Sequence, residues 1–398
     1  MLSVEEARDR IGAHARLTDA EPVVLQEAAG RVPASFEVIA AVDVPPFANS
    51  AMDGFALRAA DAPGELRLTG EAAAGSGPLP TLGPGEAVRI MTGAPIPPGA
   101  DTVVPLEEAV ELGGERVRLP ATAAGAHVRP AAHDTRAGDR VALPVEPLAP
   151  ATIAVLASIG FGQVEVRRRP TVAILSTGDE LVAPGMPLGP GQIHDANSAS
   201  LAAAVAEAGG EPWLLPRVPD NPAAIERVLA DGAADADLLV ASGGVSVGRH
   251  DHVRSAIERL GMLDFWRIAV QPGKPLAFGS VAGRPVIGLP GNPVSALVTF
   301  ELFGRPLLRA MLGLAGDGRL HLAARLEERL IKDPARRAYL RVVVRRGPDG
   351  WLARGAGGQG SAQLRPLAAA NALLVVPEGE PAGEPGRTYD ALLLGEIA

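Results

Sequence analysis

The sequence predicts a multidomain protein in which a central α/β domain is flanked by β-rich regions. Three short apolar runs between residues 172 and 289 each end in a polar loop and lead into a helical pattern. Fully apolar strands that alternate with helices are typical of a parallel sheet covered on both faces, which is a doubly wound fold. On either side of this block, glycine and proline punctuate short alternating runs, a pattern that favours antiparallel β-domains.

The composition bounds the class of protein. A chain of 398 residues is long enough for roughly two to four domains. Its net charge of −9 argues against a nucleic-acid-binding surface, which needs a basic footprint. The absence of cysteine excludes disulfides, thiolate metal sites and cysteine nucleophiles. The N-terminus lacks the features of a signal peptide, and the longest apolar region, residues 294–314, carries charges. We therefore expect a cytoplasmic protein without a membrane partner.

In the N-terminal half, Ser3 and Glu6 form a capping-box pattern that predicts a helix over residues 4–15. Local chemistry favours a proline-rich linker that ends in an Asp-Gly turn for residues 44–55. Alternating runs predict an antiparallel β-domain with strands at 65–69, 87–91 and 116–119. A helix is expected over 151–159, and the arginine triplet 167–169 is expected to be a solvated hinge.

In the C-terminal half, the predicted strands of the α/β domain cover residues 172–175, 238–240, 265–270 and 285–289. Its predicted helices cover 196–208, 222–229 and 251–261, and a long helix begins at Pro293. From residue 318 onward, strands are expected at 321–331, 339–346, 373–377 and 388–394. This pattern predicts a small all-β C-terminal domain.

Two loops of the α/β block carry features of an anion site. Ser242, Gly243 and Gly244 place flexible backbone at a strand end, where N–H groups can approach an anion. The loop Pro290-Gly291-Asn292-Pro293 opens a helix, whose N-terminus favours negative charge. The alternative for Asn292 is helix capping alone. Because ligands bind beyond the carboxyl ends of parallel strands, this edge is the site hypothesis.

Two further features are charged. Asp179 and Glu180 follow a strand, where carboxylates can hold Mg²⁺, although adjacent acids also occur in simple polar loops. Lys274 lies in a rigid Pro-Gly-Lys-Pro turn, and one charge-assisted bond from it to an oxyanion contributes about 1.5–3 kcal/mol. The histidines show no zinc spacing, and neither a P-loop nor a dinucleotide-binding motif is present.

Six strings that occur in one order resemble the MoeA family, the molybdopterin molybdenumtransferases, which includes the E domain of gephyrin. The strings are Asn49–Gly54 (NSAMDG), Met91–Pro95 (MTGAP), Ser176–Leu181 (STGDEL), Ser242–Gly248 (SGGVSVG), Pro272–Pro275 (PGKP) and Leu289–Ser295 (LPGNPVS). The resemblance covers essentially the whole chain.

The resemblance implies four domains: an extended domain (residues 1–45 with 135–168), an inserted β-rich domain (46–134), an α/β molybdopterin-binding domain (169–316) and a C-terminal β-barrel (317–398). It implies an elongated homodimer that inserts molybdate into adenylated molybdopterin with release of AMP, using Mg²⁺, in molybdenum cofactor biosynthesis. The implied protein partners are a molybdopterin adenylyltransferase and apo-molybdoenzymes.

The resemblance also implies roles for residues. The expected catalytic residues are Asp53, Thr92, Asp134, Glu180, Asp251 and Lys274. The expected substrate-binding residues are Thr177, Gly178, Asp220, Ser242, Gly243, Gly244, Ser246, Pro290, Gly291, Asn292, Pro293 and Ser361. The expected Mg²⁺ ligands are Asp179, Glu180 and Asp251.

The chain departs from the family pattern at two positions. Many relatives have Asp at the place of Ala48, and some have a basic residue at the place of Gln271, which leaves the anion selectivity, molybdate or tungstate, open. Two other functions stay open from the sequence. The central domain also resembles molybdopterin adenylyltransferases, and a non-catalytic scaffold related to gephyrin is the other alternative.

Overall fold

The computed structural model describes the chain except for residues 76–78, 80, 246–251 and 398. The chain forms two compact units. We call residues Met1–Glu21 with Arg167–Ala398 the α/β–barrel unit, and Pro22–Val166 the inserted unit. Where the chain enters and leaves the inserted unit, β1 (Ala20–Val24) pairs with β12 (Gln163–Arg167). The boundaries of the four expected domains stay a prediction.

The α/β–barrel unit contains a six-stranded sheet. Its order is β16 (Glu211–Leu214), β13 (Thr171–Ser176), β17 (Leu238–Ser242), β21 (Arg284–Leu289), β20 (Ala277–Val281) and β18 (Gly261–Trp266). The first four strands are parallel, whereas β20 runs antiparallel to both of its neighbours, so the sheet as a whole is mixed. The expected strand 265–270 is wrong, because Arg267 adopts a left-handed φ of 89° and ends β18 at Trp266.

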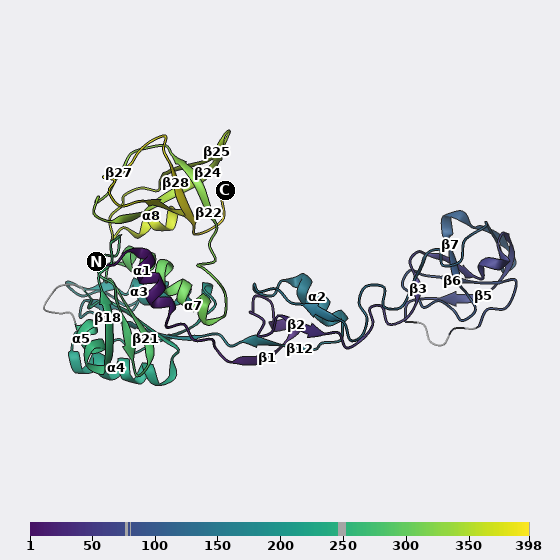
Figure 1. Ribbon diagram of the computed structural model, residues 1–398, viewed down its shortest axis with the longest axis horizontal. Helices are drawn as coiled ribbons and strands as arrows, with labels where there is room; N and C mark the ends of the chain where they lie inside the picture. Colours follow the sequence, from purple (N-terminus) through teal and green to yellow (C-terminus); the bar gives the residue numbers. More distant parts are fainter. Residues whose placement is uncertain (76–78, 80, 246–251, 398) are drawn as a thin grey trace. The chain divides into compact units, whose positions relative to one another are not determined.

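Helices cover both faces of this sheet, as the doubly wound prediction requires (Figure 1). Val172 and Ile174 of β13 pack on the side of α1 (Val4–Gly12), α3 (Ala196–Glu207), α6 (Pro293–Thr299) and α7 (Arg305–Met311). The alternate residues Ala173 and Leu175 pack on the side of α4 (Pro222–Asp235) and α5 (His252–Leu260). Because successive strand residues point to opposite faces, β13 is buried on both sides.

The long helix that begins at Pro293 changes its winding in the middle. A π-helical turn, η4 (Phe300–Gly304), separates α6 from α7. The expected Glu301–Arg305 pair forms at 3.6 Å. Both side chains are buried, and Glu301 also accepts hydrogen bonds from Arg319 at 2.5 and 3.1 Å. No helix in the described part of the chain is long and apolar enough to cross a membrane.

Five C-terminal strands form a closed barrel, because the last strand of the series pairs back with the first. In order, they are β24 (Arg337–Gly347), β25 (Gly350–Gly355), β22 (His321–Leu326), β28 (Thr388–Leu393) and β26 (Ala372–Val376). Leu340 and Val342 fill the barrel interior, whereas Tyr339 and Leu373 on its outer face pack into the core of the α/β domain. The remaining elements here are β19 (Val270–Gln271), β23 (Leu330–Ile331), β27 (Ala382–Gly383) and α8 (Leu364–Ala369).

The inserted unit is built on a second six-stranded sheet. Its order is β7 (Thr102–Pro105), β4 (Gly54–Leu57), β6 (Glu86–Ile90), β5 (Gly64–Ala72), β9 (Arg116–Leu119) and β8 (Val110–Gly113). The antiparallel prediction is wrong for β5 and β6, which run parallel because their connection crosses over instead of turning back. The linker interpretation of residues 44–55 is also wrong, since residues 49–50 form a strand that pairs with another and β4 begins at Gly54.

The smaller elements of the inserted unit complete it. The strand pairs are β2 (Glu37–Ile39) with β11 (Arg140–Ala142) and β3 (Asn49–Ser50) with β10 (Val128–Arg129). The helices are η1 (Leu25–Glu27), η2 (Ala59–Asp61), η3 (Leu106–Glu108) and the predicted α2 (Pro150–Ser158).

His321 of the barrel generates a prediction on pH. Its Nδ1 lies 2.9 Å from Asp390, and its Nε2 lies 3.2 Å from Asp317. Burial alone would lower the pKa of His321, but these two hydrogen-bonded carboxylates raise it above the ordinary value of 6.5. Both ring nitrogens can donate only when the imidazole is protonated. The stabilisation is therefore fully present below about pH 6.5 and is lost as pH rises through the raised pKa.

We expect His321→Gln to lower the melting temperature most near pH 6 and to have little effect near about pH 9. The measurement is a melting series of wild type and variant at several pH values. His194→Gln is the control, because His194 is exposed and forms no ion pair with a described residue. If the melting difference between wild type and His321→Gln stays constant from pH 6 to about pH 9, protonation of His321 does not contribute to stability.

Candidate functional site

A pocket of about 640 Å³ lies beyond the carboxyl ends of β13, β17 and β21. Its walls come from the loops that follow these strands, from α3 and from the barrel. The lining residues are Thr177, Gly178, Glu180, Leu181, Ile193, Asn197, Asp220, Ser242, Gly243, Gly244, Val245, Pro275, Pro290, Gly291, Asn292, Pro293 and Ala362. The pocket therefore lies at the carboxyl edge of the sheet, where the sequence predicted the site.

Most of the expected substrate-binding residues lie in this lining. Ser361 contacts the lining residue Asn292, and Lys274 precedes the lining residue Pro275. Ser246 and Asp251 lie outside the described residues. Asp53, Thr92 and Asp134 belong to the inserted unit.

Asn197 connects two of the pocket loops. Its side-chain Nδ2 donates to Ser242 Oγ at 2.7 Å and to the carbonyl oxygen of Gly291 at 2.9 Å. Its Oδ1 has no hydrogen-bond partner among the described residues. The sequence suggested only a helix start at this position, and the helix cap is in fact Asp195, which accepts from the Ser198 N–H at 3.0 Å. Asn197, in the first turn of α3, is therefore free to hold the two loops together.

The glycine loop differs from its expected role. The N–H of Gly243 donates to the carbonyl oxygen of Leu289 at 3.1 Å, so it extends the sheet and does not face an anion. Gly243 has a φ of 93°, and a Cβ there would lie 2.8 Å from the carbonyl oxygen of Thr177. Only glycine fits this approach without strain. Thr177 itself is 6% exposed, and its hydroxyl oxygen has no hydrogen-bond partner among the described residues.

Asn292 does more than end a loop. It occupies the N-cap position of α6, but its side chain makes no capping hydrogen bond. The side-chain Nδ2 instead donates to Ser361 Oγ at 3.0 Å. The carbonyl oxygen of Ser361 accepts from the N–H of Val294 at 3.1 Å. The barrel thus occupies part of the helix N-terminus that the sequence left open for an anion, and it brings Ser361 to the pocket.

A buried arginine holds the barrel loop that carries Ser361. Arg341 is 1% exposed, and its Nη2 donates to the carbonyl oxygens of Gly358 and Gly360 at 2.9 and 3.1 Å. Burial lowers its pKa, and it forms no ion pair with any described residue. Successive residues of β24 alternate between the two faces, and this places Arg341 on the outer face of the barrel. A residue at such a position would be expected to be exposed to solvent. The fold buries that face against the α/β domain.

Trp266 anchors the other side of the glycine loop. Its indole N–H donates to the carbonyl oxygen of Val245 at 3.2 Å. Two guanidinium groups lie over its ring, Arg254 at 4.2 Å and Arg267 at 3.8 Å. The strained backbone of Arg267 aims its side chain at this ring. Sequence reasoning missed this stack, since its members come from two different elements.

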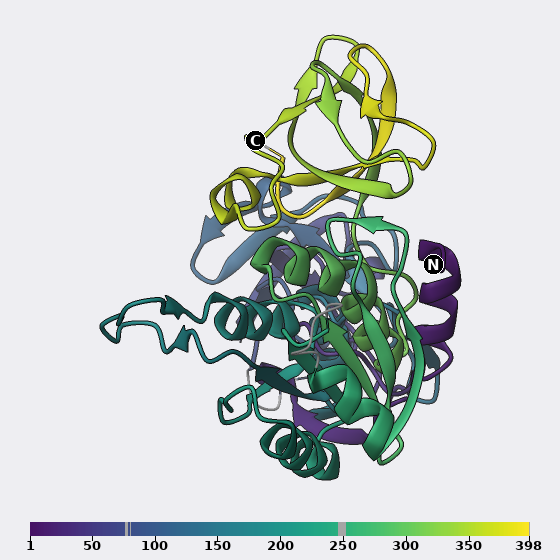
Figure 2. The same cartoon turned by 90° about the vertical axis from the view of Figure 1, so that its left-hand side faces the viewer.

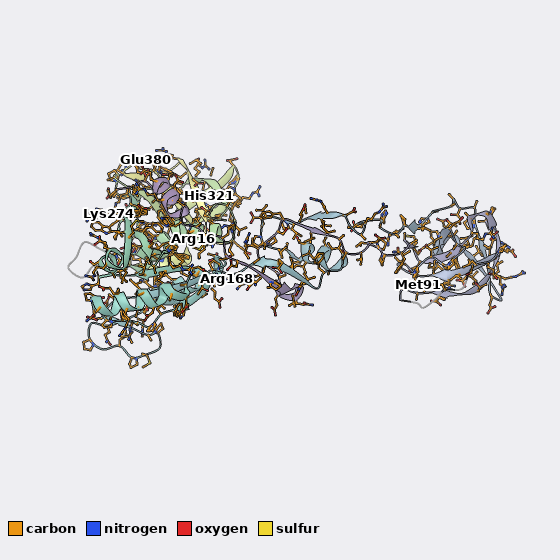
Figure 3. The ribbon with its side chains drawn as sticks, turned by 60° about the horizontal axis from the view of Figure 1, so that its bottom comes forward. Arg16, Met91, Arg168, Lys274, His321 and Glu380 are labelled. Carbon is orange, nitrogen blue, oxygen red and sulfur yellow. The ribbon has the colours of Figure 1, made fainter. Side chains whose placement is uncertain are left out.

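The charged residues of the site are spread around the rim. Glu180 and Asp220 line the pocket, while Asp179 Oδ1 accepts from the Asp220 N–H at 3.1 Å. The described residues contain no group of three acidic or histidine side chains placed to hold a metal ion. Lys274 is exposed and forms no ion pair with a described residue (Figure 3). The side chain of Gln271 accepts from the Asp333 N–H at 2.8 Å, so it fastens this loop to the barrel.

The loop between β14 (Leu181–Val182) and β15 (Ile193–His194) begins and ends at the pocket, and projects from it (Figure 2). Residues 181–193 contain no charged side chain, and Met186 and Leu188 are exposed.

In the inserted unit, the structure brings Asp53 and Thr92 together. The backbone N–H and the hydroxyl of Thr92 both donate to Asp53 Oδ1 at 2.7 Å. The hydrogen bond from the Thr92 backbone, and after it the one from the Thr92 hydroxyl, lower the pKa of Asp53, so its carboxylate is ionised near neutral pH. Asp134 lies in a separate turn, where its N–H donates to the carbonyl oxygen of Val44 at 2.9 Å.

Comparison with known proteins matches these regions to three family models. Residues 2–160 match the MoeA N-terminal region (domain I and II), residues 173–310 a probable molybdopterin binding domain, and residues 323–394 the MoeA C-terminal region (domain IV). A molybdopterin molybdenumtransferase 2 of Mycobacterium tuberculosis is 38% identical over 392 residues, covering 95% of this chain and 96% of the relative. A molybdopterin molybdenumtransferase of Haemophilus influenzae is 40% identical and covers 79% and 78%.

A solved structure agrees with the sequence relatives. The crystal structure of a molybdopterin biosynthesis MoeA protein from Pyrococcus horikoshii has a TM-score of 0.85 and 32% identity, and the match covers 100% of both chains. The chain therefore belongs to the MoeA family, the molybdopterin molybdenumtransferases.

Proposed function

We propose that this protein inserts molybdate into adenylated molybdopterin and releases AMP, as a step of molybdenum cofactor biosynthesis. The observation that carries the proposal is the pocket of about 640 Å³ at the carboxyl edge of the sheet. Pockets of about 300–1,000 Å³ suit small-molecule ligands, and this edge is where doubly wound sheets bind them. The names of the sequence relatives supply the substrate class.

The pocket residues divide into neutral polar groups and charged groups. Thr177 and Asn197 line the pocket, and each has a buried side-chain oxygen without a hydrogen-bond partner in the described chain, which a donor of a polar ligand would satisfy. Glu180 and Asp220 supply negative charge. Lys274 supplies a cation held between two prolines, and we assign to it the binding of the molybdate oxyanion.

We propose that Glu180 and Asp220, with Asp251, hold Mg²⁺ at the pocket. Magnesium binds through one or two protein carboxylates and completes its shell with waters and substrate phosphates, so a three-residue cage is not required. Glu180 and Asp220 both line the pocket and supply the carboxylate oxygens that Mg²⁺ prefers, whereas Asp179 accepts the Asp220 N–H. When bound, Mg²⁺ would stabilise negative charge on the phosphoanhydride as a Lewis acid. The protein's own part is to orient the adenylyl phosphate with Lys274 and the loop donors.

We further propose that the protein is a homodimer in which Asp53 and Thr92 of one subunit serve the pocket of the other. Support comes from the inserted unit. Helix α2 contains no charged side chain and is mostly apolar, yet only Leu156 of it is buried. Phe36, Ile39 and Val145 of the same unit are also exposed. An apolar helix is normally covered on all sides, and exposed apolar patches mark interaction surfaces.

The first test is AMP release. We expect protein supplied with adenylated molybdopterin, molybdate and Mg²⁺ to release AMP and to activate an apo-molybdoenzyme. Glu180→Gln should reduce this rate tenfold or more, on the order expected when a metal ligand is lost, and should weaken its Mg²⁺ dependence. Glu396→Gln, on the exposed C-terminal segment, is the matched control. Formation of adenylated molybdopterin from ATP would indicate the adenylyltransferase alternative, and turnover unaffected by Glu180→Gln would remove Glu180 from the mechanism.

The second test concerns the oxyanion. Lys274→Ala should raise the molybdate concentration for half-maximal rate by about 10- to 100-fold, the equivalent of one charge-assisted hydrogen bond. Because Lys274 is exposed and without an ion pair in the described chain, the melting temperature should stay unchanged. An unchanged molybdate dependence would place the oxyanion elsewhere.

The third test concerns the shared site. Asp53→Ala and Glu180→Gln should each lose most of the activity alone. Equal amounts mixed should restore about a quarter of the wild-type activity per site, since about half of the dimers are then mixed and one of the two pockets in each mixed dimer is intact. Subunit exchange is followed by mass spectrometry of differently tagged chains. Complete exchange without any recovered AMP release would show that both residues act within one chain.

A further inference from the structure

A second pocket, of about 250 Å³, lies in the α/β–barrel unit at the opposite edge of the same sheet. Three of its residues mark the starts of the central strands: Arg168 precedes β13, Asp237 precedes β17, and Arg284 opens β21. Since these strands are parallel, this edge is separated from the larger pocket by the length of the sheet.

One arginine of this pocket is part of its frame. Arg168 donates two hydrogen bonds to the carboxylate of Asp237, at 2.8 and 3.0 Å, and the N–H of Thr171 donates a third at 2.8 Å. Burial alone would raise the pKa of Asp237, but these donors lower it, so the carboxylate stays ionised and paired. The neighbouring Arg167 donates to the carbonyl oxygen of Thr18 at 2.9 Å. The expected solvated hinge at residues 167–169 is therefore wrong for these two arginines.

Two other arginines line the pocket with unused donors. Arg16 is exposed and forms no hydrogen bond or ion pair with a described residue. The Arg284 side chain is 41% exposed, and its closest approach to a carboxylate is 3.9 Å, to the Asp237 oxygen that Arg168 already holds. Figure 3 shows Arg16 and Arg168 in the same region of the unit. Three guanidinium groups thus face two carboxylates, those of Asp19 and Asp237, and leave one positive charge in a chain of net charge −9.

We propose that this pocket binds a phosphate group, as inorganic phosphate or as a small phosphate monoester, between Arg16 and Arg284. Guanidinium groups match the tetrahedral oxyanion with paired donors, and the paired Arg168 and Asp237 keep the cavity preformed. His14 forms one wall, where its ring packs edge-on against Phe278 at 5.1 Å. Residues 16–19 lead into β1 and Arg168 follows β12, so the anion would bind at the root of both chain connections to the inserted unit.

The test is a binding titration of the full-length protein with inorganic phosphate and, separately, with AMP. We expect one saturable phosphate site by calorimetry and a shift of the His14 ring signal in the NMR spectrum of histidine-labelled protein. Arg16→Gln and Arg284→Gln should each weaken phosphate binding tenfold or more. Arg325→Gln, an exposed arginine of the barrel, should bind like wild type. Arg16→Gln should keep the wild-type melting temperature, because the Arg16 side chain is exposed and forms no hydrogen bond or ion pair with a described residue.

A Lys274→Ala protein separates the two pockets. Phosphate binding that persists in Lys274→Ala and falls in Arg16→Gln supports the proposal. If AMP binding also falls in the arginine variants, the ligand of the second pocket is a phosphate monoester. If AMP binding depends only on Lys274, the ligand of the second pocket is inorganic phosphate. The absence of saturable binding, or unchanged affinity in both arginine variants, would overturn the proposal. None of these measurements uses molybdopterin, so their outcome is independent of the proposed reaction.

Discussion

Parallel strands deliver their carboxyl ends to one edge of a sheet, and the main pocket depends on this constraint. Ser176 of β13 pairs with Ser242 of β17, and Ser242 pairs in turn with Leu289 of β21. The three loops therefore leave the sheet at the same level. Asn197 bridges two of them, and the sheet hydrogen bond of Gly243 fixes the position of the glycine turn. The loops have little freedom to separate.

The C-terminal barrel completes a wall that the α/β domain leaves open. Alternate residues of its strands face opposite sides. The even-numbered residues of β24 fill the barrel interior, whereas Tyr339 of the same strand contacts the α/β core. This contact places residues 357–361 over the N-terminus of α6, where Ser361 meets Asn292 and Val294. The buried guanidinium of Arg341 donates hydrogen bonds to carbonyl oxygens of the 357–361 loop and holds it in place. Burying a cation that has no ion pair among the described residues is costly, and the hydrogen bonds of Arg341 to the carbonyl oxygens of Gly358 and Gly360 offset part of that cost.

The two edges of the central sheet differ in chemistry. The carboxyl edge has loops with neutral donors and carboxylates at the rim, whereas the opposite edge gathers arginines around Asp237. The same alternation of strands and helices creates both edges, because every crossover connection returns the chain to the strand starts. The connections to the inserted unit follow the residues of that second edge along the chain, and the inserted unit contains a carboxylate of its own, Asp53, which accepts two hydrogen bonds from Thr92.

The sequence by itself determined the alternation of strands and helices, the capped helix start at Ser3, the helices that begin at residues 196 and 222, and the membership of the loops after β13, β17 and β21 in one site. These features depend on local periodicity, capping and the parallel direction of strands, which are readable from neighbouring residues. Only the tertiary structure decided which partners the polar groups take. Arg341 became buried, the Gly243 N–H joined the sheet, Asn292 turned to Ser361, and Arg168 closed on Asp237. Each of these contacts joins residues that are distant in sequence, except within the Arg341 loop, and their burial depends on the packing of whole elements, which no local pattern encodes.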